Sequence, residues 1–192
     1  MPDRHTIANM ALGRLGASRI QSFSDGTVQS DLCRDHYDQC VRECLEDHPW
    51  NFAEAAVALS QDATAARPDY SFSYEVPVDC VAPRWLMRAD GSPAGPRYPY
   101  RIGKSKLCTD LDGAWLVYTY KAPEHRFSPL FVAALHHLLA ARLAGPITET
   151  ETKAQYEQAL YERTLARART RNSQQDTPEQ FDTSTLIAVH HG

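Results

Sequence analysis

The sequence predicts a mainly α protein with an inserted small antiparallel β region, an α+β fold. Its expected form is a helical bundle with a long C-terminal helix and a flexible C-terminal tail. Three observations predict it: helical periodicity toward both ends, short alternating runs in the middle, and a last stretch without lysine or arginine. With 192 residues, 43% of them hydrophobic, the chain has the size and composition of one globular domain. We expect that domain over residues 1–171 and a flexible arm over 172–192.

Two amphipathic helices are expected before the β region, over about residues 4–15 and 28–46. Gly16 is placed to end the first helix. The second ends before Pro49, because the residue that precedes a proline is pushed out of the helical region. The second helix carries a core face at steps of three and four residues: Cys33, Tyr37, Cys40 and Cys44.

Between about residues 50 and 121 the pattern changes to short alternating runs, which predict a β region. In one run Tyr70, Phe72 and Tyr74 alternate with serines, as in an antiparallel sheet that covers a core on one side. Turn dipeptides such as Asp112-Gly113 separate the runs. The expected strands are 52–59, 70–76, 83–88, 98–102 and 115–121.

Helical periodicity then returns over about residues 129–144. Ser128 can cap this helix, and Pro129 fits its first turn. The run is apolar nearly all round and is closed by Gly145-Pro146. Such a helix is expected at the centre of the fold.

A last helix is expected over about residues 149–171. Thr148 and Glu151 have the spacing of a capping box at its start. The arm that follows is rich in polar residues and is expected to be unstructured alone. It ends in a short apolar run: Leu186, Ile187, Ala188 and Val189.

The composition argues against two classes of protein. Twenty basic against 24 acidic residues give a net charge of −4, which is unsuited to a surface that neutralises nucleic-acid phosphates throughout. No stretch has the roughly 18 uncharged residues that favour a membrane span, and the start of the chain lacks the apolar core of a signal peptide. We therefore expect a soluble protein made in a cytoplasm, with no membrane partner.

The five cysteines favour reduced thiols over a disulfide framework, because their number is odd and no CxxC spacing occurs. Cys33, Cys40 and Cys44 fall on one side of a helix with His36. The helix rises ~16 Å from residue 33 to residue 44, whereas the ligands of one zinc ion lie ~2.0–2.3 Å from the metal. We expect buried thiols that line a helix contact, and neither a metal nor another cofactor.

No pattern predicts an enzyme. Gly103-Lys104-Ser105 resembles the end of a phosphate-binding loop, but Tyr98 stands where that loop needs glycine, so a turn between strands is expected. His136-His137 point about 100° apart on an apolar helix, which favours one buried, hydrogen-bonded histidine and one at a helix interface. Glu43 and Glu46 have the residue types of a glycosidase pair, although neighbouring surface carboxylates are ordinary.

A basic stripe lies near the end of the last helix, where Arg163, Arg167 and Arg171 follow one another at steps of four residues. Cations at this end complement the helix dipole by ~0.3–1 kcal/mol each. The same stripe suits an acidic protein partner or DNA. The sequence leaves these three interpretations open.

Several stretches have a familiar composition and order along the chain. They are Ala11–Ala17 followed by Ile20, His48–Ala53, Tyr74–Cys80, Leu107–Asp110, Leu116–Tyr120, and Ser128–Phe131 leading into Leu138–Ala141 and Pro146–Thr148. This ordered set resembles the tail tubular protein A and head-to-tail adaptor family of tailed bacteriophages. The resemblance covers about residues 6–171. Its signature residues mark architecture: Pro49, Trp50 and Phe52 as a hinge into the sheet, and Tyr74, Pro77 and Asp79 around a strand end and a turn.

The resemblance implies a structural virion component without catalytic activity. It implies a ring, generally of twelve subunits, that sits beneath the portal protein and continues the DNA channel toward a tail-side neck protein, a stopper or nozzle. DNA is expected to cross this channel without sequence-specific binding, which suits a modestly acidic chain. The expected location is the head-tail junction of the virion, after synthesis in the host cytoplasm. The same ring occurs in gene transfer agents.

The C-terminal segments of relatives dock onto the portal, which implies portal-binding residues in this chain. A short apolar segment can add a strand to a neighbouring sheet edge through main-chain hydrogen bonds. Two alternatives remain: a peptidoglycan hydrolase associated with the neck, and a DNA-contacting neck protein that uses the arginine stripe. The portal-binding hypothesis names the apolar residues Leu186, Ile187 and Val189 together with Arg163, Arg167 and Arg171.

Overall fold

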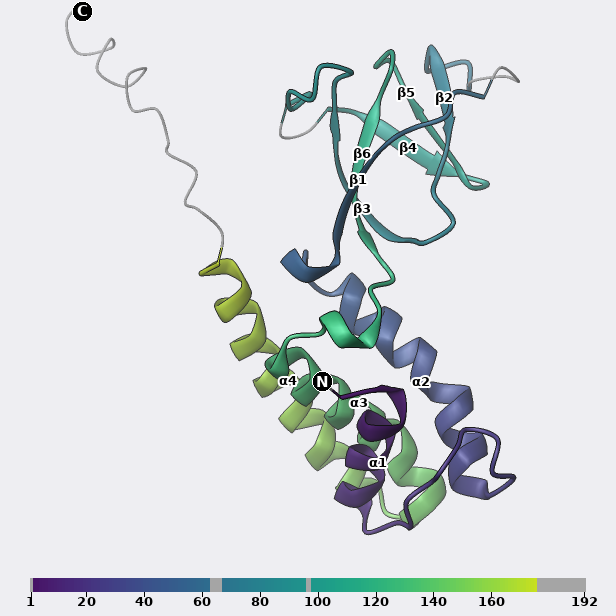
Figure 1. Cartoon of the computed structure of the whole chain (residues 1–192), viewed down its shortest axis with the longest axis vertical. Helices are drawn as coiled ribbons and strands as arrows, with labels where there is room; N and C mark the ends of the chain where they lie inside the picture. Colours follow the sequence, from purple (N-terminus) through teal and green to yellow (C-terminus); the bar gives the residue numbers. More distant parts are fainter. Residues whose placement is uncertain (1, 63–66, 96–97, 176–192) are drawn as a thin grey trace, which may run out of the picture.

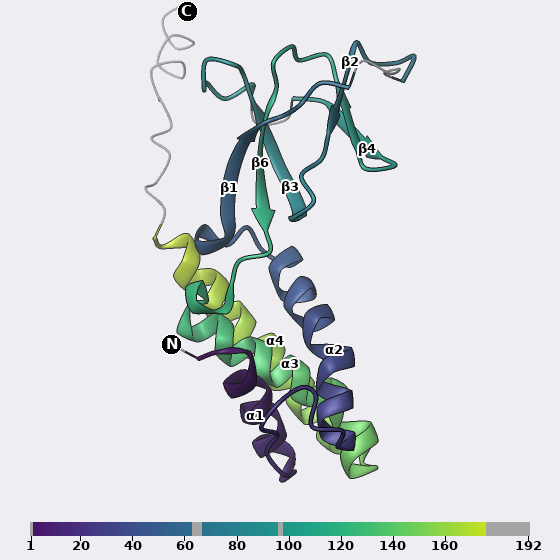
Figure 2. The same ribbon diagram turned by 45° about the vertical axis from the view of Figure 1, so that its right-hand side comes forward.

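The computed structural model describes residues 2–62, 67–95 and 98–175. In this part of the chain, four helices and two small antiparallel sheets make an α+β fold (Figure 1). The helices gather at one end of the molecule and the strands at the other, and a view turned by 45° shows the same separation (Figure 2). The helices are α1 (Arg4–Leu15), α2 (Val28–Glu46), α3 (Pro129–Thr148) and α4 (Glu151–Ser173).

The first two helices begin and end where the sequence predicts, because local side chains cap them. Asp3 accepts a hydrogen bond from the backbone N–H of Thr6 at 2.8 Å, and Gly16 ends α1 with φ of 73°. Thr27 and Ser30 form a reciprocal cap at the start of α2, each accepting from the other's backbone N–H. Residues within a few positions therefore define where these helices begin and where α1 ends.

The helix α3 is the centre of the helical part and packs against α1, α2 and α4. Leu135, Leu138 and Leu139 are fully buried in the core that these helices share. By length and composition alone, α3 is the one helix among the described residues that could cross a membrane. Half of its apolar stretch is buried within the structure, as in the core helix of a folded protein.

The predicted boundary between the last two helices is wrong. α3 continues through Gly145-Pro146 to Thr148, because a proline in the final turn removes only one backbone hydrogen bond. Thr148 donates its hydroxyl to the carbonyl of Ala144 at 2.7 Å, so it belongs to α3 and forms no capping box. Glu149 ends α3 with φ of 52°, and Thr150 precedes α4 without a side-chain cap bond. α4 accordingly spans 151–173 and not 149–171.

The β region contains two three-stranded antiparallel sheets where the sequence suggested a single small sheet. β2, β5 and β4 form one sheet, with β5 in the middle, and β1, β6 and β3 form the other, with β6 in the middle. The strands are β1 (Glu54–Ala58), β2 (Phe72–Glu75), β3 (Cys80–Met87), β4 (Tyr100–Gly103), β5 (Lys106–Thr109) and β6 (Trp115–Tyr120).

Four of the five predicted strands start two or three residues from the expected position, and one strand was not predicted. The chain makes a short 3₁₀ turn over Asn51–Ala53, so β1 starts at Glu54 and not at residue 52. β3 starts at Cys80, ahead of Pro83, which an edge strand with irregular pairing tolerates. β5 follows the expected turn at 103–105, but its four residues are too few to show an alternating pattern.

The two sheets enclose a second core, separate from the helical one. Tyr74 of β2 and Leu107 of β5 face Leu116 and Tyr118 of β6, and all four are at most 5% exposed. Tyr74 also donates its hydroxyl to the carbonyl of Leu111 at 2.8 Å. The β part therefore holds its own shape and meets the helical part at a junction.

Replacing Leu138 by Ala tests whether α3 is the core helix of the fold. We expect the free energy of unfolding to fall by about 2–5 kcal/mol, because the substitution leaves a cavity among fully buried side chains. Chemical denaturation followed by circular dichroism measures it. Val78→Ala is the control, because Val78 is fully exposed and such changes stay within about 0.5 kcal/mol. Equal stability of the two variants would contradict this description of the core.

Candidate functional site

The segment His48–Asn51 joins the helical part to the β part. α2 ends at Glu46, and Pro49 prevents a further helical turn. The backbone N–H of Trp50 donates to the carbonyl of His48 at 2.9 Å, which turns the chain toward β1. Three predicted architectural residues, Pro49, Trp50 and Phe52, thus lie where the chain crosses between the two parts.

Trp50 is the best buried residue of the junction, with 1% of its surface exposed. Its indole N–H donates to the carbonyl of Cys44 in α2 at 2.7 Å. Its ring stacks on Phe52, with centroids 5.8 Å apart, and meets the edge of Phe131 in α3 at 5.2 Å. One aromatic side chain therefore ties the end of α2, the entry to β1 and the start of α3.

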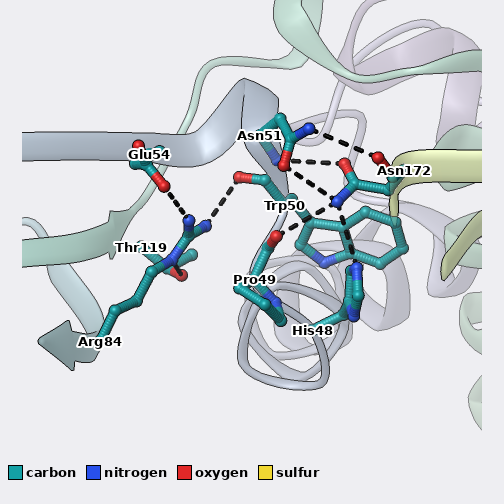
Figure 3. A network of polar contacts seen from close by, with 8 residues as sticks. All are labelled: His48, Pro49, Trp50, Asn51, Glu54, Arg84, Thr119 and Asn172. Carbon is teal, nitrogen blue, oxygen red and sulfur yellow. Dashed lines mark hydrogen bonds and ion pairs between the residues drawn. The ribbon is translucent and has the colours of Figure 1, made fainter. Parts of the chain in front are cut away.

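Asn172, in the last turn of α4, holds the backbone of the same segment (Figure 3). Its side-chain oxygen accepts from the N–H of Asn51 at 3.0 Å, and its amide nitrogen donates to the carbonyl of Pro49 at 3.2 Å. The same nitrogen lies 3.1 Å from His48 Nε2 and from Asn51 Oδ1. Only 7% of Asn172 is exposed, so these bonds replace its contact with water.

Arg84 binds the segment from the side of the sheet (Figure 3). Its guanidinium donates to the carbonyl of Trp50 at 2.7 Å and to Thr119 Oγ1 of β6 at 3.1 Å, and it forms an ion pair with Glu54 of β1. The Arg84 side chain is 6% exposed. Arg84 of β3 therefore links Glu54 of β1 and Thr119 of β6 to the backbone carbonyl of Trp50.

The groups that meet at this junction are amides, backbone carbonyls, one imidazole, one hydroxyl, one guanidinium and one carboxylate. They bind one another and fix the orientation of the β part relative to the helices. This is the chemistry of a structural joint. The fold and the junction together define an α+β protein whose two parts are held in a set arrangement.

Two of the joint's residues, Asn172 and Arg84, were missed from the sequence. Asn172 was expected to begin the flexible arm, but α4 continues to Ser173 and buries it. A polar residue near a helix end normally indicates a solvent-exposed position. Its partners lie 121 to 124 residues away in the sequence, so no local pattern could identify them.

The residues expected around the second motif occupy the β part. Pro77 follows β2, and its carbonyl accepts from the N–H of Cys80 at 3.0 Å in a turn. Asp79 accepts the hydroxyl of Tyr118 at 3.1 Å, which joins that turn to β6. Tyr74 is buried in the core of the two sheets. These residues stabilise the β part and do not meet at the junction.

The residues predicted to bind the portal are described only in part. Arg163, Arg167 and Arg171 lie on α4 with exposed side chains. Leu186, Ile187 and Val189 lie outside the described residues.

A buried carboxylate, Glu157 of α4, joins three helices away from the junction. It is 1% exposed and accepts from Arg14 of α1 at 2.9 Å. His137 Nδ1 of α3 lies 2.7 Å from its other oxygen. The hydrogen bond to Glu157 raises the pKa of Arg14 above its ordinary value. Because the charges are paired, this carboxylate tolerates burial.

His136 is the second member of the histidine pair, and its Nδ1 lies 3.1 Å from the carbonyl of Val132 in the same helix. Burial lowers the pKa of His136 below 6.5, and the neighbouring His137 lowers it further. The two histidines thus face different partners, one on its own helix and one on α4. His136 favours the neutral form in the folded protein.

The thiols and carboxylates considered for chemistry occupy structural positions. Burial raises the pKa of Cys33 to about 11 and that of Cys40 to about 12, so both thiols stay protonated and unreactive at neutral pH. Glu43 accepts two hydrogen bonds from Arg142 of α3, at 2.9 and 3.1 Å. Within the described residues, no group of three or more metal-ligating side chains is placed to hold a metal ion.

Comparison with known proteins adds no assignment. No known family model matches the sequence, and no curated protein matches it significantly. The resemblance to phage adaptors therefore rests on the ordered sequence motifs alone.

Replacing Asn172 by Ala tests the joint. We expect the free energy of unfolding to fall by about 1–3 kcal/mol, because the backbone N–H of Asn51 and the carbonyl of Pro49 lose a buried partner. Thermal and chemical denaturation measure the change. Ser173→Ala, at the exposed next position, should leave stability unchanged. If both variants were as stable as the parent, Asn172 would belong to the arm, as the sequence first indicated.

The lowered pKa of His136 predicts a loss of stability in acid. The unfolded chain takes up a proton on this ring at a higher pH than the folded protein, so stability falls as the pH drops below about 6.5. Between about pH 7.5 and about pH 5.5, His136→Gln should therefore lose less stability than the parent protein in chemical denaturation. His125→Gln, at an exposed position, should behave like the parent. An equal acid loss in all three proteins would exclude His136 as the cause.

Proposed function

We propose that this protein is a non-enzymatic head-to-tail adaptor, a connector subunit of a ring that joins the portal of a phage or gene transfer agent to its tail. The ring, of twelve subunits as the resemblance implies, continues the DNA channel toward a tail-side stopper or nozzle. DNA passes through it without sequence-specific binding. The protein works at the head-tail junction of the virion and is made in the host cytoplasm.

One observation supports this proposal most directly. All six strands are inserted between α2 and α3, and the insertion is held by His48–Asn51, part of one of the stretches that resemble the adaptor family. A connector must keep a set angle between the part that packs in a ring and the part that projects. The buried bonds to Trp50 and Asn172 serve that requirement.

The proposal includes a finer description of the helical part as a bundle that forms the body of the ring. α3 lies at its centre, and α1, α2 and α4 contribute to the same core. The mixed acidic and basic surface of the helices suits contacts between copies. Its ion pairs, such as Arg4 with Asp38 and Arg142 with Glu43, lie at the surface and contribute little to stability.

The portal contact is assigned to the C-terminal end of the chain. The arm, with Leu186, Ile187 and Val189, is proposed to add a strand to a sheet edge of the portal. The arginine stripe lies next to the point where the arm leaves α4. It supplies positive charge beside the proposed contact.

A second candidate, a DNA-contacting neck protein, is favoured by the same stripe. In the part of the chain that the structure describes, Arg163, Arg167 and Arg171 form no ion pair, so their charges are available to phosphates. DNA affinity that falls steeply with salt would support this candidate, and salt-independent or absent binding would remove it.

Mixing the protein with purified rings of its cognate portal tests the adaptor function. We expect subunits to join the rings in size-exclusion chromatography with light scattering, because the arm is proposed to add a strand to a portal sheet edge. No association at micromolar concentration would contradict the proposal.

Two truncations separate the arm from the fold. Removing residues 176–192 should abolish portal binding and leave the helix and strand content unchanged in circular dichroism, because every described helix and strand remains. The variant that lacks residues 172–192 should have a lower melting temperature than the first truncation, because Asn172 is also lost. Portal binding by the variant that lacks only residues 176–192 would exclude the arm as the docking segment.

A further inference from the structure

A pocket of about 370 Å³ opens beside the end of α4. Its apolar wall comes from Phe52 at the junction, Leu130 at the start of α3 and Ala168 of α4. Ser128, Arg171, Asn172 and Gln175 supply the polar part of the lining. Gln175 is the last residue that the structure describes, so the chain leaves the described part at the edge of this pocket.

The arginine stripe runs along α4 to the same place. Its three arginines are exposed, and among the described residues none of them has an acidic partner. Neighbouring arginines of the helical part are paired: Arg169 with Asp47, and Arg142 with Glu43. The stripe is therefore an unpaired basic surface about 12 Å long at 1.5 Å per residue, leading to an apolar pocket.

The chain that follows has the complementary composition. Residues 176–182 read DTPEQFD, with three carboxylates, no cation and a single aromatic side chain, Phe181. The six residue steps from Gln175 to Phe181 span at most ~20 Å when extended, which is enough to reach any part of the pocket or the stripe. The pocket has room for a phenyl ring, and its apolar wall offers that ring a contact surface.

We propose that residues 176–182 fold back onto the end of α4 in the same chain, with Phe181 in the pocket and the three carboxylates along the arginine stripe. The stripe then fixes the place and direction in which the arm leaves the body. Leu186, Ile187 and Val189 lie beyond this anchor and stay free for a partner. The inference goes beyond the adaptor function and holds whether or not the partner is a portal.

The anchor should be stable enough to detect. Burial of a phenyl side chain contributes a factor of roughly ten to a hundred in favour of the docked state, and the conformational entropy lost by the segment opposes it. The ion pairs lie at the surface, so salt should weaken them. Together these effects predict a segment that is docked most of the time and released by modest changes.

Hydrogen exchange of the full chain, compared with a synthetic peptide of residues 176–192, tests the proposal without any partner protein. We expect the amides of 177–182 to exchange at least about tenfold more slowly in the chain than in the peptide. The amides of 186–190 should exchange equally fast in both. Equal rates at 177–182 would overturn the proposal, and they would leave the portal experiment unaffected.

Substitutions locate the contact. Phe181→Ser, and Arg167→Glu combined with Arg171→Glu, should each return 177–182 to the rate of the peptide. Arg42→Glu is the matched control, because Arg42 is also exposed on a helix and has no ion pair among the described residues. It should leave the protection in place. Protection that survives the arginine substitutions, or that Arg42→Glu also removes, would overturn the assignment to the stripe.

Dilution distinguishes docking of residues 176–182 within one chain from docking onto a second copy. Protection by the chain's own anchor is independent of protein concentration, and this is the expected result. Protection that disappears on dilution would assign the pocket to the arm of a neighbouring copy and overturn the intramolecular proposal.

Discussion

The burial of Trp50 is the constraint on which the rest of the structure depends. Its side chain lies in the helical core against Phe131, while its carbonyl accepts the guanidinium of Arg84 from the sheet. One residue therefore belongs to both parts of the molecule. Withdrawing Trp50 from the helical core together with the sheet would expose a large aromatic surface and break the hydrogen bond from the indole N–H to the carbonyl of Cys44 in α2.

The β part is held at both of its ends by the same core. The chain leaves the helices through Trp50 and Phe52 and returns through Ala122 and Phe127, and all of these side chains pack in or against the helical core. The rings of Phe127 and Phe131 lie 4.7 Å apart, and Phe127 also meets Phe52. An insertion with its own core and two anchored ends moves as a unit with the body that carries it.

Local signals made part of this structure predictable, and distant contacts made the rest unpredictable. Helices α1 and α2 follow from periodicity and caps that lie within a few residues of each end. β5 escaped prediction because its four residues are too few to show an alternating pattern, although the turn that precedes it was expected. Asn172 and Arg84 escaped it because their partners are 121 and 34 residues away. The hinge motif could therefore be located from the sequence, but the two side chains that bind its backbone, Asn172 and Arg84, could not.

The position of Asn172 couples the arm to the joint mechanically. It lies three residues before the end of the described chain and binds the backbone of Pro49 and Asn51. Tension applied to the arm would therefore act on the last turn of α4 and, through these two hydrogen bonds, on the turn that orients the sheet. The packing of α4 on α3 would share that load.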